Sequence, residues 1–269
     1  MIKDVSFGQY ISKNSLIHKL DPRLKLFLLI AYIIFIFLAS NAYSLLFITA
    51  ATFFILFLSK ISLKTYFKNI RMIIPIIIFT SLLNALYSGG GTLLFSYGFI
   101  KIYTSGIYRA CFMTVRIISL ILISSVLSYT TTPTDLTDAI ESLLSPLKYL
   151  GLKNAVHTMA MMMTIALRFI PALIEETDKI MSSQKARGAS MESGGLIKRI
   201  KALLPILIPL LISSIRRSYE LAEAMESRCY NGAEGRVRMK EMHFINKDYF
   251  SFAFSIVVFS VTIILNILF

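Results

Sequence analysis

The chain of 269 residues is strongly apolar and strongly basic at the same time, with 56% hydrophobic residues, a mean hydropathy of +0.70 and a formal net charge of +13. This combination is typical of an integral membrane protein and not of a soluble basic protein. The basic residues lie between apolar runs, without an aromatic-basic stacking platform, so no nucleic-acid partner is expected. The first twenty residues are polar and lack a small-residue cleavage site, so no cleavable signal peptide is expected.

Five segments are predicted to span a membrane, because each approaches the 20 or so apolar residues that a spanning helix needs. They lie at about 24–40, 43–59 and 72–87, within 106–129 and within 249–269. The first two are short and are separated by a tight turn at Ser40-Asn41, which predicts a helical hairpin.

The distribution of lysine and arginine predicts the orientation of these spans. Residues 1–25 carry five such cations, residues 60–71 carry four and residues 131–248 carry sixteen. The loop at 88–105 carries one. The positive-inside rule therefore places the N-terminus and residues 131–248 in the cytoplasm, and the C-terminus and a flexible, glycine-containing loop at 88–105 outside.

Two arginines complicate the fourth span. Arg109 and Arg116 share one helix face, and no acidic residue lies in any span to neutralise them. Intramembrane arginines are costly and often functional. Alternatively, residues 106–116 form an outer amphipathic turn, and the span begins near Ile117.

The cytoplasmic tract is predicted to contain three helices. The first begins with Thr132 as N-cap and Pro133 in the first turn, and its apolar stripe ends near Leu150. Asp135 and Asp138 suit the positive end of the helix dipole, which explains them without a metal site. The cysteines, Cys111 and Cys229, indicate no metal site or disulfide framework either.

The second and third helices are expected over about 154–185 and 196–230. The second is apolar enough to span, but a span here would place basic residues on both sides, so we expect it to lie at the inner membrane face. Its methionine cluster indicates either an adaptable binding surface or core filling. We expect the apolar halves of both helices to form the seat of a partner; their marker residues are Met159, Met161, Met162, Met163, Pro205 and Pro209.

A short signature occurs twice in this tract, as Ala186-Arg187-Gly188 and as Ser227-Arg228-Cys229. The two arginines are 41 positions apart, and each follows a segment with helical periodicity. The lead-in sequences align without a gap, so that Ile174 matches Ile215. One arginine at a helix C-terminus is explained by the dipole. The same small-Arg-small triplet twice indicates two equivalent docking prongs.

These residues resemble the transmembrane T component of energy-coupling factor (ECF) transporters, ATP-binding-cassette importers of vitamins and transition metals such as cobalt. The resemblance covers nearly the whole chain and rests on five motifs besides the general pattern: Asp21-Pro22-Arg23-Leu24-Lys25, Pro133-Thr134-Asp135-Leu136, Leu167-Arg168-Phe169-Ile170-Pro171, Gln184-Lys185-Ala186-Arg187-Gly188 and Ala224-Met225-Glu226-Ser227-Arg228. The second triplet is Ser-Arg-Cys here, where Ala-Arg-Gly is common in the family.

The resemblance implies an all-α integral membrane protein with about five spans and three cytoplasmic helices, two of them long. It implies membrane helices in 1–130, a coupling module in 131–248 and a last span in 249–269. The triplets then dock into two ATPase subunits, and the membrane half holds a substrate-binding S component in a bacterial or archaeal plasma membrane.

The resemblance also implies a non-catalytic subunit without a cofactor. Because the chain carries no Walker-type phosphate-binding loop, it is expected neither to bind nor to hydrolyse nucleotide by itself. The alternatives are an intramembrane enzyme, which would need acids or a nucleophile-base set in the spans, and a stand-alone secondary transporter, which usually shows repeated spans.

Overall fold

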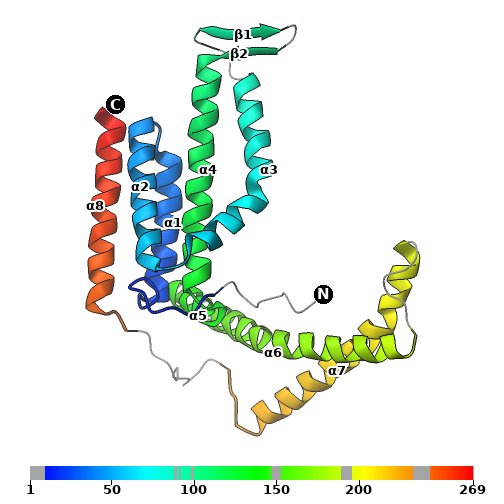
Figure 1. Cartoon of the computed structure of the whole chain (residues 1–269). Helices are drawn as coiled ribbons and strands as arrows, with labels where there is room; N and C mark the ends of the chain where they lie inside the picture. The colour runs from blue at the N-terminus through cyan, green and yellow to red at the C-terminus, as the bar shows by residue number, and fades with distance from the viewer. Residues whose placement is uncertain are drawn as a thin grey trace. The chain divides into compact units, whose positions relative to one another are not determined.

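The chain forms two compact helical units in the computed structural model, which describes residues 10–87, 90, 92–97, 100–146, 153–188, 196–232 and 243–268 (Figure 1). The first, here called the membrane unit, comprises Gly8–Leu136 and Lys240–Phe269. The second, here called the long-helix unit, comprises Thr137–Met239.

The membrane unit is a bundle of helices organised around α4. Its helices are α1 (Pro22–Leu38), α2 (Ala42–Ser59), α3 (Leu63–Tyr87), α4 (Thr104–Thr130) and α8 (Asn246–Leu268). Helix α4 packs against α1, α2 and α3, and α8 packs against α1 and α2. Tyr32, Ile36, Ile48, Ile123 and Val258 are buried together where α1, α2, α4 and α8 meet. The all-α class predicted from the sequence is confirmed.

Helix α3 contains Pro75, and Figure 1 shows that this helix bends along its length. A proline inside a helix removes one backbone hydrogen bond and crowds the preceding turn, which bends the helix.

The Asp-Pro-Arg motif ties three helix ends of the membrane unit together. The Asp21 carboxylate caps α1 by accepting from the Arg23 backbone N–H at 2.8 Å. The Asp21 backbone N–H in turn donates to the Asp248 carboxylate, in the first turn of α8, at 2.9 Å. One turn into α1, the buried Lys25 ammonium donates to the carbonyl of Thr130, the last residue of α4, at 3.1 Å. The motif therefore fixes where the bundle begins.

Among the described residues, five helices are long and apolar enough to cross a membrane: α2, α3, α4, α6 (Lys153–Ala186) and α8. The number matches the prediction, but the set differs. Helix α6, which we expect at the inner membrane face, satisfies both length and composition. Helix α1 has 17 residues, or roughly 26 Å at 1.5 Å per residue, and is at the short limit for a span.

The predicted outer loop at 88–105 contains regular structure, so the expectation of a flexible loop is wrong for its second part. Strands β1 (Leu93–Tyr97) and β2 (Ile100–Tyr103) form an antiparallel hairpin. Both strands are rich in branched and aromatic residues, which favour extended backbone. The expectation of flexibility rested on the run Gly89-Gly90-Gly91, of which Gly89 and Gly91 lie outside the described residues and Gly90 adopts a φ of 133°.

Residues 106–116 continue without a break into the rest of α4, so the chain has no separate turn before Ile117; the alternative that the span itself begins near Ile117 stays a prediction. The Arg116 guanidinium donates to the carbonyl of Ala39, at the C-terminal end of α1, at 2.5 Å. It also lies 4.8 Å from the ring centre of Phe112. A helix C-terminus carries partial negative charge, so Arg116 is accommodated without an acidic partner and α4 continues. Arg109 is exposed.

The long-helix unit contains most of α5 (Pro133–Leu143) together with α6 and α7 (Leu196–Glu226). The predicted bounds of α6 and α7 are close to the observed ones. The prediction that α5 continues to about Leu150 is wrong, because the helix ends at Leu143. Pro146 explains the early end, because proline has no backbone N–H to continue the helical hydrogen bonds and its ring crowds the preceding turn.

Candidate functional site at the ends of the long helices

The two arginine triplets form the same backbone turn. Each arginine follows the end of its helix by one or two residues, since α6 ends at Ala186 and α7 at Glu226. The Arg187 N–H donates to the Gln184 carbonyl at 3.2 Å, and the Arg228 N–H donates to the Met225 carbonyl at 3.2 Å. Donors and acceptors are offset by 41 positions between the two turns, as in the sequence repeat.

The third residue of each triplet completes the match. The Gly188 N–H donates to the Lys185 carbonyl at 3.0 Å, and the Cys229 N–H donates to the Glu226 carbonyl at 2.9 Å. Both residues adopt positive φ, 86° for Gly188 and 54° for Cys229. Left-handed residues of this kind commonly end helices. The second triplet therefore keeps the backbone geometry of the first although a cysteine replaces the glycine.

Both arginine side chains are exposed, as are the small residues that flank them. In the part of the chain that the structure describes, neither arginine belongs to an ion pair. A guanidinium keeps its charge at any physiological pH and binds carboxylates with a planar fork of donors. The helix dipole stabilises a cation at the C-terminal end of each helix. This effect does not explain why the whole turn occurs twice.

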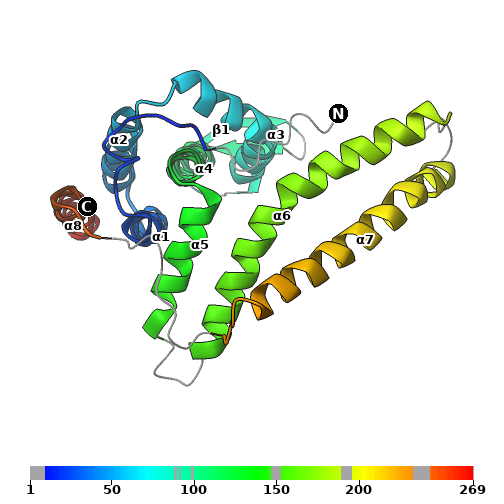
Figure 2. The ribbon, with the colours of Figure 1, turned by 90° about the horizontal axis from the view of Figure 1, so that it is seen from below.

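Helices α6 and α7 run in opposite directions, and α7 begins where α6 ends (Figure 2). They pack against each other, and the Arg217 guanidinium of α7 donates to the Glu176 carboxylate of α6 at 2.5 Å. Because the helices are antiparallel, Arg187 and Arg228 lie at opposite ends of the pair.

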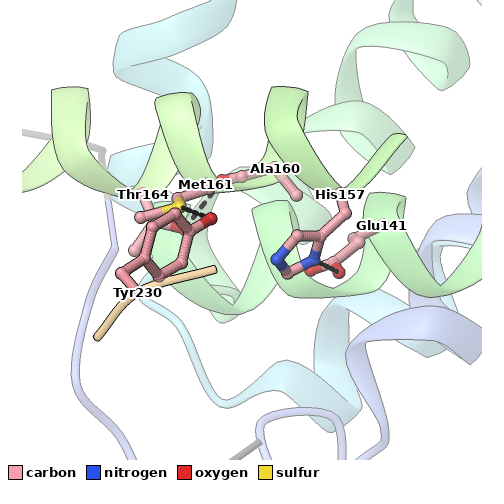
Figure 3. Close-up of polar contacts among 6 residues, drawn as sticks. All are labelled: Glu141, His157, Ala160, Met161, Thr164 and Tyr230. Atoms are coloured by element: carbon pink, nitrogen blue, oxygen red, sulfur yellow. Dashed lines mark hydrogen bonds and ion pairs between the residues drawn. The ribbon is translucent and has the colours of Figure 1, made fainter. Parts of the chain in front are cut away.

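A polar contact holds the second triplet against α6 (Figure 3). The Tyr230 hydroxyl, two residues after Arg228, donates to the sulfur of Met161 at 2.8 Å. Nearby, His157 of α6 and Glu141 of α5 lie 3.2 Å apart through Nδ1 and Oε1. The chain that follows α7 and the end of α5 are therefore both attached to the first third of α6.

The antiparallel arrangement separates the two halves of the predicted partner seat, the methionines of α6 and the prolines of α7. Met159, Met162 and Met163 are exposed, whereas Met161 is half-buried beneath Tyr230. Pro205 and Pro209 are also exposed. The methionines precede Glu176 on α6 and the prolines precede Arg217 on α7, so in an antiparallel pair they lie on opposite sides of the ion pair. The structure does not bring the two patches side by side.

Sequence reasoning missed three residues that organise the site: Glu176, Arg217 and Tyr230. Of these, only Glu176 and Arg217 left a readable signal, because they carry opposite charges at equivalent positions of the 41-residue repeat.

The five long, apolar helices among the described residues are those of a multi-pass membrane protein. Residues 13–239 match the family model described as cobalt transport protein, CbiQ. The chain is similar to the energy-coupling factor transporter transmembrane protein EcfT of Clostridium kluyveri, with 44% identity over 99% of this chain and 98% of the relative. The proteins of the same name from Ruminiclostridium cellulolyticum and Bacillus subtilis are 48% and 42% identical, each over 92% of this chain and over 92% and 93% of the relative. The chain belongs to this family of transmembrane components of ECF transporters.

Proposed function

We propose that this subunit transmits the motion of two ATP-binding-cassette ATPases to a substrate-binding S component, and so drives uptake of a vitamin or a transition metal. The subunit itself is non-catalytic and resides in the plasma membrane with the long-helix unit on the cytoplasmic side. The family description names cobalt transport, and the names of the curated relatives specify no substrate.

The observation that carries this proposal is the occurrence of one exposed arginine turn twice, with equivalent hydrogen bonds and positive φ at the same position. Two ATPase subunits of the same fold present two equivalent sockets, and two equivalent turns suit them. A guanidinium entering a socket carboxylate is held by charge and by a planar pair of hydrogen bonds, so it moves with its host.

Long helices suit this role because they carry displacement over distance. The 34 residues of α6 extend roughly 50 Å at 1.5 Å per residue. A displacement of the helix end at Arg187 then reaches the opposite end of α6, where the exposed methionines lie. We propose that Met159, Met162 and Met163, and separately the segment around Pro205 and Pro209, contact the S component.

Charge reversal at the two arginines tests the proposal in the intact transporter. Arg187→Glu or Arg228→Glu should weaken ATPase docking by about 2–5 kcal/mol, because a carboxylate would face the socket in place of its cationic partner. We expect each single variant to lower ATP-driven uptake and the double variant to abolish it. Uptake into proteoliposomes and co-purification of the ATPases are the measurements.

The matched control is Lys179→Glu with Arg216→Glu, which makes the same total charge change at exposed positions on the same two helices. It should retain uptake. Normal uptake by the Arg187→Glu/Arg228→Glu protein would refute the proposed function.

A further inference from the structure

The ion pair between α6 and α7 joins equivalent positions of the internal repeat. Glu176 and Arg217 are 41 residues apart, the same separation as that of Arg187 and Arg228. When two copies of a motif are related by a two-fold axis, a residue contacts its own equivalent only close to that axis. The Glu176–Arg217 contact therefore marks the local two-fold axis of the helix pair.

The arms on the two sides of this axis are equal in length. Arg187 follows Glu176 by eleven residues, and Arg228 follows Arg217 by eleven residues. Each arm is roughly 16 Å long at 1.5 Å per residue. Since the turns at both ends are also matched, the pair presents two arginines at equal distances from the ion pair.

The opposite charges of Glu176 and Arg217 suit a contact close to the local two-fold axis. Two identical charged residues would repel each other there, so the repeat carries a carboxylate on one helix and a guanidinium on the other. The Arg217 and Glu176 side chains are 36% and 21% exposed, which leaves their attraction only partly screened by water. The neighbouring Glu175 and Arg216 are exposed and form no ion pair in the described part of the chain.

We propose that Glu176 and Arg217 are positioning residues that fix the register of α6 against α7, so that Arg187 and Arg228 engage a two-fold symmetric ATPase pair at a set separation. This inference rests on the proposed function. Without the ion pair the helices slide along each other, the separation between Arg187 and Arg228 changes, and the two arginines no longer fit both sockets at once.

Charge exchange in the complete transporter tests this inference. The variants are Glu176→Arg, Arg217→Glu and the exchanged pair that combines both. The matched controls are Glu175→Arg, Arg216→Glu and their combination. Two quantities are measured: uptake per ATP hydrolysed, and the distribution of distances between spin labels at the native Cys229 and at Lys185→Cys, in a Cys111→Ser background.

Each single variant should lower uptake per ATP about two- to fivefold, in keeping with a partly exposed ion pair, and should broaden the distance distribution. The exchanged pair should restore both, and the controls should resemble the parent protein. Single variants with unchanged coupling and distances, or an exchanged pair no better than the singles, would overturn the inference. If the Arg187 and Arg228 variants abolish uptake while the Glu176 variants do not, only the positioning role fails.

Discussion

Gly188 and Cys229 occupy the same left-handed backbone conformation with different side chains. A residue with a Cβ atom in this conformation costs roughly 1–2 kcal/mol, whereas glycine enters it freely. Among the described residues, no atom lies within 4 Å of a Cβ placed on Gly188, so the cost of a substitution there is expected to come from the backbone. The first turn is therefore relaxed and the second is strained.

Opposite substitutions in the two turns should have opposite effects. Gly188→Val should weaken ATPase binding about tenfold, because roughly 1–2 kcal/mol of backbone strain shifts the turn away from its docking geometry. Cys229→Gly should preserve or tighten binding, since it removes the same kind of strain. Titration of the purified membrane complex with ATPase subunits measures both.

Cys229→Ser is the control for thiol chemistry, because it keeps a Cβ atom and should behave like the parent protein. If Gly188→Val bound the ATPases as tightly as the parent does, the matched turns would be irrelevant to docking.

Among the elements, long helices were predictable and short connections were not. Many periodic residues define α6 and α7, and small residues or glycine mark their ends, so the predicted bounds nearly coincide with the observed ones. The end of α5 depends on a single residue, Pro146, against a continuing apolar stripe. The hairpin β1–β2 depends on pairing between strands, which local composition does not reveal.

The arginine triplets were predictable because they are a repeated sequence signal. Their hydrogen bonds and φ angles depend on how the backbone closes after each helix, and the sequence shows only that small residues permit it. The division of the predicted seat was not predictable, because it follows from the direction in which α7 returns along α6.

Substitutions at two adjacent methionines of α6, Met162 and Met161, should affect different partners. Met162→Asp should release the S component while the ATPases still co-purify, because an exposed apolar contact is replaced by a solvated charge. Met161→Asp should instead weaken docking at the second triplet, because it disturbs the contact with the Tyr230 hydroxyl. Co-purification of each partner with the tagged subunit measures both effects.

Met162→Leu is the matched control and should retain both partners. Release of the ATPases by Met162→Asp, with the S component still bound, would reverse the proposed assignment.

At the scale of the whole molecule, the distribution of basic residues predicts which side of the membrane each segment faces. In a background without Cys111 and Cys229, a membrane-impermeant thiol reagent added outside should label Thr92→Cys, which precedes the hairpin, and not Ser183→Cys near the end of α6. Both positions are exposed, so accessibility on the protein itself does not bias the comparison.

Permeabilised cells provide the control, because Ser183→Cys should then react. Labelling of Ser183→Cys from outside in intact cells would invert the orientation and separate the arginine turns from any cytoplasmic ATPase.

The proposed docking of the two matched turns into the two ATPases can be tested by photo-crosslinking from Lys185 and Glu226. These exposed residues precede the two arginines at equivalent positions, so that a photoreactive residue there leaves the arginines intact. With benzoylphenylalanine at either position in the assembled transporter, we expect an adduct with an ATPase subunit. With the photoreactive residue at both positions, we expect a species carrying two ATPases. Adducts from either position with the S component or lipid, and none with an ATPase, would contradict the proposed docking.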